Sequence, residues 1–100
     1  MKYTATEIKN MVKDASSIET YKYTDCTHRL HTDCIKYIGN SCFNESEIDN
    51  LPYDEDGNVD VDVEIMNGER YNETILANCS GVFTDFNEED DKVAVIVVRN

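Results

Sequence analysis

The residues with the clearest chemical potential form an acidic row. Asp60, Asp62 and Glu64 alternate with apolar residues in the run VDVDVEIM, residues 59–66. Successive side chains of a β-strand point to opposite faces, so these three carboxylates are expected on one face and the apolar residues on the other. Alternate strand residues lie roughly 6.6 to 6.8 Å apart, close to two phosphate rises of about 3.4 Å each along DNA. The spacing predicts a face that mimics a nucleic-acid backbone.

Two further acidic segments extend this predicted surface. They are Asp54, Glu55 and Asp56, just before the row, and Glu88, Glu89, Asp90 and Asp91, near the C-terminus. The alternative is an ordinary solvated sheet face. Clustered like charges repel one another and weaken a fold, however, unless a partner neutralises them. We therefore interpret the acidic row and both segments as a partner-binding surface.

The segment from Asp54 to Asp60 also invites a calcium interpretation. With Gly57 at the sixth loop position, Asp54, Asp56 and Asn58 align with oxygen ligands of an EF-hand. Pro52 stands where the first carboxylate is needed, and Val63 stands where the bidentate Glu belongs. The EF-hand is rejected, and an acidic turn is expected.

Residues 26–34 contain every ligand type that zinc prefers. On a helix, Cys26 and Cys34 would lie about 12 Å apart and could not share one ion. His31 and Cys34 with Cys42 or Cys79 remain a possible set, so a small zinc-binding regulatory module is the alternative function. Cysteines packed as small apolar groups are the simpler interpretation.

The sequence contains no motif that predicts an enzyme. An acidic environment raises the pKa of a cysteine thiol, which opposes a Cys-His nucleophile. The sequence has no glycine-rich phosphate loop, serine elbow or HExxH motif. We predict no enzyme and no cofactor.

The acidic row needs a strand to hold it, and the sequence predicts a hairpin there. Asn67-Gly68 follows the row directly, and Asn-Gly between strand-like runs is a strong hairpin signal. A three-residue loop, Met66 to Gly68, followed by a second strand over 69–77, would set Val63 beside Tyr71 and Glu64 opposite Arg70.

Helices and two more strands are expected around the hairpin. Thr4 and Glu7 form a capping box for a short helix that ends near Ser16-Ser17, and a second helix is predicted from Asp25 to Ile38. Residues 18–23 favour a short strand, and the run VAVIVV within 92–99 favours a central strand buried on both faces.

The expected fold class is α+β, with N-terminal helices packed on an antiparallel three- to four-stranded sheet. The length of 100 residues indicates a single domain, 1–100. The predicted core members are Ile8, Met11, Val12, Leu30, Cys34, Ile38, Val61, Val63, Ile65, Ile75, Val95 and Val97.

The charge distribution restricts the partners. The net charge is −12, of which residues 51–100 contribute −10, from three Lys/Arg and thirteen Asp/Glu. Such a field repels nucleic acid and anionic membranes and attracts basic proteins. No apolar run resembles a signal peptide or a membrane span, so a cytoplasmic location is expected.

In size, charge and overall texture, the chain resembles the small proteins with which bacteriophages block host defence, including anti-CRISPR and anti-restriction proteins. The resemblance implies a stoichiometric inhibitor that acts as a DNA mimic on a CRISPR effector or a similar nuclease, as a monomer or homodimer. No motif is matched, so no residue role is carried over. An antitoxin or immunity protein shares the same physics and remains a further alternative.

Overall fold

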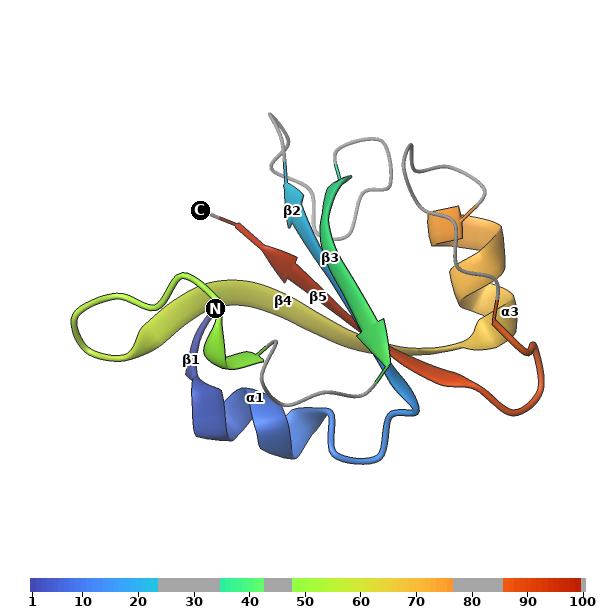
Figure 1. Ribbon diagram of the computed structural model, residues 1–100, viewed down its shortest axis with the longest axis horizontal. Helices are drawn as coiled ribbons and strands as arrows, with labels where there is room; N and C mark the ends of the chain where they lie inside the picture. The colour runs from blue at the N-terminus through green and yellow to red at the C-terminus, as the bar shows by residue number, and fades with distance from the viewer. Residues whose placement is uncertain (24–34, 43–47, 77–85, 100) are drawn as a thin grey trace.

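The structure is a computed structural model, and it describes residues 1–23, 35–42, 48–76 and 86–99 (Figure 1). The strands are β1 (Lys2–Thr4), β2 (Ser17–Tyr23), β3 (Ile35–Cys42), β4 (Asn58–Asn67) and β5 (Lys92–Val98). The helices are α1 (Ala5–Met11), α3 (Gly68–Tyr71) and the π-helix η2 (Asn72–Leu76). None of the helices among these residues is long and apolar enough to cross a membrane.

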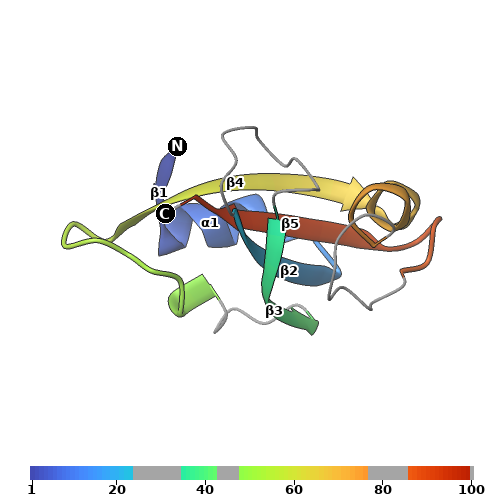
Figure 2. The same ribbon diagram turned by 90° about the horizontal axis from the view of Figure 1, so that it is seen from above.

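The sheet is mixed, and this corrects the antiparallel sheet that we predicted. The five strands follow the order β1-β4-β5-β2-β3, and β2 runs parallel to β5 while every other pair is antiparallel. Seen from above, the four longer strands lie side by side in this order (Figure 2). The α+β class itself is confirmed.

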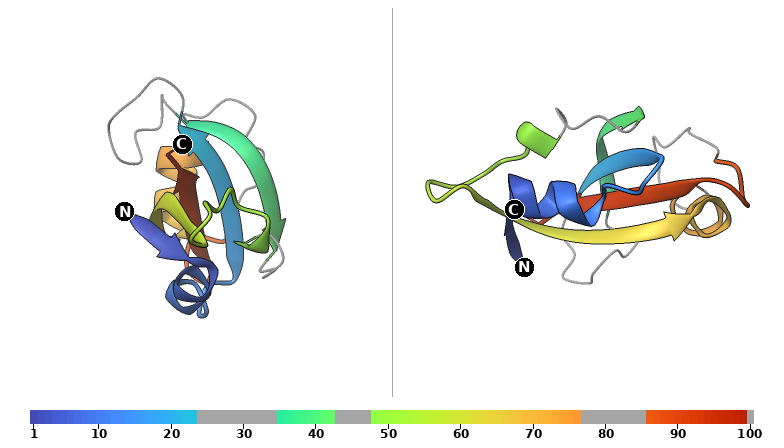
Figure 3. Two further views of the ribbon diagram at one scale, coloured as in Figure 1. Left: turned by 90° about the vertical axis from the view of Figure 1, so that its left-hand side faces the viewer. Right: turned by 90° about the horizontal axis from the view of Figure 1, so that it is seen from below.

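Strand β5 lies between β4 and β2, as its uniformly apolar sequence predicts. Val93, Val95 and Val97 point to one face and Ala94, Ile96 and Val98 to the other, and all six are fully buried or nearly so. Each face therefore carries its own apolar cluster. Helix α1 covers one face, and α3 with η2 covers part of the other (Figure 3).

The cluster under α1 begins with the predicted capping box. The Thr4 side chain accepts the N–H of Glu7, and the Glu7 carboxylate accepts the N–H of Thr4. Ile8 and Val12 then point into the sheet, with no exposed surface. Met11 was predicted to be buried but is 38% exposed, because it lies at the margin of the helical face that Ile8 and Val12 bury.

The predicted hairpin is wrong beyond Asn67. Residues 68–76 form helical turns in place of a second strand, and the Asn67 side chain caps α3 by accepting the N–H of Arg70 at 2.8 Å. Asn is a preferred helix N-cap as well as a turn residue, so Asn67-Gly68 fits both outcomes. Tyr71 and Ile75, four residues apart, then reach the second cluster together.

Two other expectations need correction. Residues 35–38, predicted as the end of a second helix, belong to β3, which pairs with β2, while residues 25–34 lie outside the described chain. Ile65 was predicted in the core but is 43% exposed, and Val63 is only partly buried. Both lie on the part of β4 whose outer side is paired with no described strand.

The remaining core predictions divide in two. Val61, Ile75, Val95 and Val97 are confirmed as buried, as Ile8 and Val12 are. Leu30 and Cys34 lie outside the described residues. Ile38 is described only as part of β3. The short strand over residues 18–23 is confirmed as β2.

Candidate functional site

The acidic row lies on one face of β4, as its alternation predicts. Asp62 and Glu64 stand beside Val97 and Val95 of β5, whose side chains belong to the cluster that includes Met66 and Tyr71. Val59 and Val61 point to the opposite face and pack under α1. The three carboxylates therefore share the face of the sheet that α3 partly covers.

Each carboxylate of the row has a cationic partner, which corrects the expectation of an uncompensated charge row. The N-terminal ammonium lies 3.0 Å from Asp60, and the Arg99 guanidinium lies 2.9 Å from Asp62. Arg70 pairs with Glu64. The last pair matches the predicted contact, although Arg70 comes from α3 and not from a second strand.

The three ion pairs differ in burial. Only 8% of the Asp62 side chain is exposed, whereas 39% of Asp60 and 27% of Glu64 are exposed. A buried carboxylate depends strongly on its partner, while an exposed ion pair adds little stability and is screened by salt. Asp62 is therefore a structural residue, and Asp60 and Glu64 remain accessible to solvent.

The first acidic segment is a turn that the Asp54 side chain organises. Its Oδ1 accepts the N–H of Asp56 at 2.9 Å and of Asn58 at 3.0 Å, and Gly57 follows at φ 81°. The bond from Asn58 lowers the pKa of Asp54, and the bond from Asp56 and the ion pair with Lys2 act in the same direction. Glu55 and Asp56 are exposed and form no ion pair with a described residue.

The second acidic segment is a turn held by Asn87. The Asn87 side-chain oxygen accepts the N–H groups of Glu89 and Asp90, and the backbone N–H of Asn87 donates to the Asp91 carboxylate at 2.7 Å. Asp91 is half-buried, and its carbonyl accepts the N–H of Gly68 at 3.1 Å. Glu88, Glu89 and Asp90 are exposed and, like Glu55 and Asp56, form no ion pair with a described residue.

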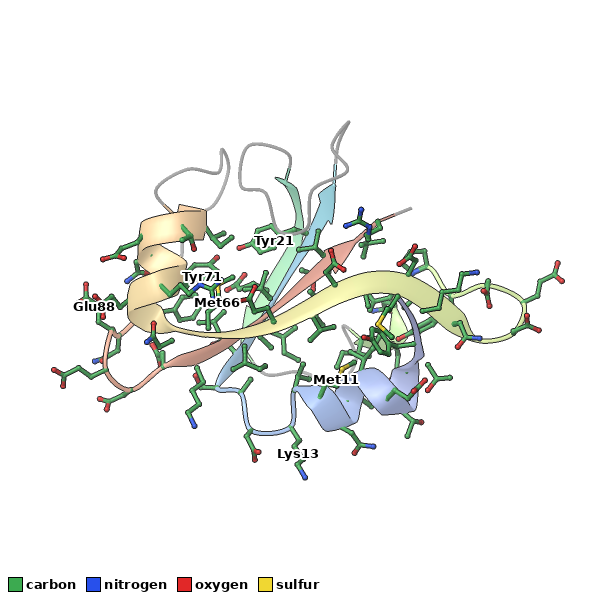
Figure 4. All side chains as sticks on the ribbon, turned by 180° about the vertical axis from the view of Figure 1, so that it is seen from behind. Met11, Lys13, Tyr21, Met66, Tyr71 and Glu88 are labelled. Carbon is green, nitrogen blue, oxygen red and sulfur yellow. The ribbon has the colours of Figure 1, made fainter. Side chains whose placement is uncertain are left out.

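The two turns lie at opposite ends of the molecule, joined by the length of β4 (Figure 1). The longest dimension of the molecule is 38 Å. Seen from behind, Glu88 extends outward at the α3 end (Figure 4). The structure therefore separates the ten predicted contact residues into a central row of ion-paired carboxylates and two end turns. In these turns Asp54 pairs with Lys2, while Glu55, Asp56, Glu88, Glu89 and Asp90 form no ion pair with a described residue.

The face of the acidic row also contains a buried aromatic contact that the sequence did not reveal. The hydroxyls of Tyr21 and Tyr71 are hydrogen bonded, and the rings of Tyr71 and Phe86 meet edge to face at 4.9 Å. These side chains gather with Met66 between α3 and the sheet (Figure 4). They stabilise the attachment of α3, which carries Arg70.

The metal interpretation falls on residues that the structure leaves undescribed. Cys26, His28, His31, Cys34 and Cys79 lie outside the described chain, and Cys42 is described only as the last residue of β3. Within the described ranges, no three His, Cys, Asp or Glu side chains are grouped to hold a metal ion. No pocket lies among the described residues either.

Comparison with known proteins adds no identification. No protein-family model matches the chain, and no match was found among curated proteins or among solved structures.

Proposed function

We propose that this chain is a non-enzymatic acidic inhibitor that binds the basic nucleic-acid-binding surface of a host defence complex, such as a CRISPR effector, in the cytoplasm of the host cell. One observation carries the proposal. Two ordered turns at opposite ends of the molecule hold clusters of exposed carboxylates that form no ion pair with a described residue, Glu55 with Asp56 and Glu88 to Asp90.

The geometry favours the turns over the central row as the main electrostatic contact. Ion pairs already compensate Asp60, Asp62 and Glu64, whereas Glu55, Asp56 and Glu88 to Asp90 form no ion pair with a described residue. The 38 Å length of the molecule corresponds to roughly 11 base-pair rises of 3.4 Å. A groove that binds duplex DNA along its backbone is basic over that distance, so it complements charge at both ends of this chain.

The test is displacement of fluorescent duplex DNA from purified basic nucleases, CRISPR effectors included. The wild-type protein is expected to displace DNA stoichiometrically, and less at higher salt, because screening weakens exposed charge contacts. Two variants remove the turn charges: Glu55→Gln with Asp56→Asn, and Glu88→Gln with Glu89→Gln and Asp90→Asn. Each is expected to weaken displacement at least tenfold.

The matched control neutralises the exposed carboxylates Asp14 and Glu69, which lie outside both turns. Asp14→Asn with Glu69→Gln changes the net charge as much as the first turn variant and is expected to leave displacement nearly unchanged. Equal losses in the control and the turn variants would indicate a nonspecific charge effect and contradict the proposal. Displacement from a toxin nuclease alone would identify an antitoxin or immunity protein.

A further inference from the structure

Among the described residues, the outer edge of β4 is open beyond its pairing with β1. Strand β1 pairs only with Asn58–Asp60, and the N–H of Val61 donates to the carbonyl of Met1 at 3.0 Å. Beyond Val61, no described strand lies outside β4 (Figure 4). An open edge exposes backbone groups that can pair with an added strand.

The direction of the backbone groups along β4 follows from two hydrogen bonds. The carbonyl of Asp60 accepts the N–H of Arg99, toward β5, and the N–H of Val61 points the other way, toward Met1. Backbone groups of successive strand residues alternate in direction. Val63 and Ile65 therefore direct their N–H and C=O groups outward, and no described residue pairs with them.

The side chains along this edge differ between the two faces of the sheet. On the α1 face, Ile65 is 43% exposed and Val63 is half-buried. On the other face, Glu64 is partly exposed beside Arg70, and Asp62 is buried. A strand added here would gain an apolar contact on one face and an accessible carboxylate on the other.

Charge opposes a second copy of this chain at the edge in the registers centred on Val63 and on Glu64. Antiparallel pairing of two β4 strands centred on Glu64 sets the two Glu64 side chains opposite each other. Pairing centred on Val63 sets Glu64 opposite Asp62. Like charges directly opposite one another destabilise a sheet, and each copy also carries a net charge of −12.

We propose that the outer edge of β4 at Val63 and Ile65 receives an extended segment of a partner protein in which cationic and apolar residues alternate. The apolar residues lie against Val63 and Ile65, and a cation lies beside Glu64, where the exposed ion pair with Arg70 is easily shared. This inference rests on the proposed function, since it supplies the basic partner with a second contact between the two acidic turns.

The probe is a fluorescent peptide that repeats Lys-Val, and the control peptide repeats Glu-Val. The wild-type protein is expected to bind only the Lys-Val peptide. Ile65→Pro and Ile65→Ala both replace the large isoleucine side chain with a smaller one, but only the proline variant also lacks the outward backbone N–H. Ile65→Pro is expected to weaken binding about fivefold or more beyond Ile65→Ala, the factor for one hydrogen bond.

A second measurement uses the unaltered protein, in case the proline variant fails to fold. Amide hydrogen exchange by NMR is expected to slow at Val63 and Ile65 when the Lys-Val peptide is added. The amides of Asp62 and Glu64 face β5 and are expected to change little. Unchanged exchange at Val63 and Ile65 under saturating peptide would overturn the proposal.

The remaining outcomes separate the two proposals. Equal peptide binding by Ile65→Pro and Ile65→Ala, or by both peptides, would overturn the edge site and leave the function of the turns intact. A wild-type dimer that Ile65→Pro converts to a monomer would show that a second copy takes the edge. Loss of DNA displacement in the turn variants with normal peptide binding would show that the two contacts are independent.

Discussion

At the scale of single residues, the partner of a carboxylate decides its role. Asp62 and Glu64 are two residues apart on the same face of β4, yet Asp62 is buried against Arg99 and Glu64 is partly exposed beside Arg70. Burial removes water from a charge, and only its partner and further hydrogen bonds replace that water. The same residue type is therefore structural at one position and accessible at the other.

This difference predicts unequal costs for removing the two arginines. Arg99→Ala removes the ion pair of the buried Asp62 carboxylate and is expected to lower the free energy of unfolding by about 1 to 3 kcal/mol. Arg70→Ala breaks an exposed pair and should cost less than about 1 kcal/mol. Urea unfolding of both variants checks the difference, and equal costs would show that burial of Asp62 has little energetic effect.

Asp54 provides a prediction on pH. Its pKa is lowered in the folded protein by hydrogen bonds from the backbone of the turn, above all from Asn58. The folded state therefore holds its proton less tightly than the unfolded chain. The ionised Asp54 carboxylate therefore stabilises the folded protein fully at pH values above the ordinary pKa of 3.8. This stabilisation is lost as the pH falls through the lowered pKa of Asp54 in the folded state.

An NMR titration of the Asp54 carboxyl is expected to give a midpoint below that of a model peptide. Asp54→Asn keeps an oxygen that accepts the turn hydrogen bonds but does not titrate. Its turn amides should then show no acid transition in this range. A midpoint at or above the ordinary value would contradict the hydrogen-bonded geometry of the turn.

At the scale of elements, the contact between α3 and the turn at 87–91 fixes the α3 end of the sheet. A Cβ atom at Gly68 would lie 2.1 Å from the carbonyl oxygen of Asn87, which is closer than two non-bonded atoms can approach. Asn72 also exchanges two hydrogen bonds with the backbone of Phe86. Glycine is needed at position 68 for this close approach, and the second acidic turn depends on it.

Gly68→Ala is expected to shift the backbone of the turn and to cost about 1 to 3 kcal/mol of stability. Gly57→Ala is the matched control, because no atom lies within 4 Å of its added Cβ and the strain comes only from its φ of 81°. Amide chemical shifts of residues 87–91 should change in Gly68→Ala and not in Gly57→Ala. Unchanged shifts in the first variant would rule out the close contact.

At the scale of the whole molecule, the net charge of −12 opposes folding. The five ion pairs among the described residues involve the three carboxylates of β4, Asp54 in the turn before it, and Asp49, which pairs with Lys9. Both turns still keep exposed carboxylates. Repulsion of this kind acts over a Debye length, which is about 10 Å at 0.1 M salt. Salt should therefore strengthen the fold while it weakens binding to a basic partner.

The thermal unfolding midpoint is expected to rise by a few degrees as the sodium chloride concentration increases from about 0.02 to 0.5 M, because the added salt screens the repulsion between the carboxylates. The variant with neutral residues at 88–90 should show a higher midpoint at low salt and a smaller rise. Differential scanning calorimetry checks both. A midpoint that falls with salt would mean that the ion pairs outweigh the repulsion.

Local sequence determined the features that depend on nearest neighbours. The capping box of α1, the alternation of β4, the turn at Gly57 and the apolar run of β5 each follow from side-chain period, capping or backbone geometry. The total charge and its concentration in the second half of the chain are likewise properties of composition. The positions of the acidic residues on one face and in two turns were therefore predictable.

Tertiary structure decided the features that depend on distant residues. Asn67-Gly68 suits either a hairpin turn or a helix start, and the space beside Asn87 and the cluster of Tyr21 and Phe86 selects the helix. Whether a carboxylate is compensated depends on Arg99 and the N-terminus, which are far away in sequence. A strand pattern fixes a face but not its neighbours. Only the assembled sheet therefore shows that the acidic row is ion-paired and that no described strand pairs with the outer edge of β4 beyond β1.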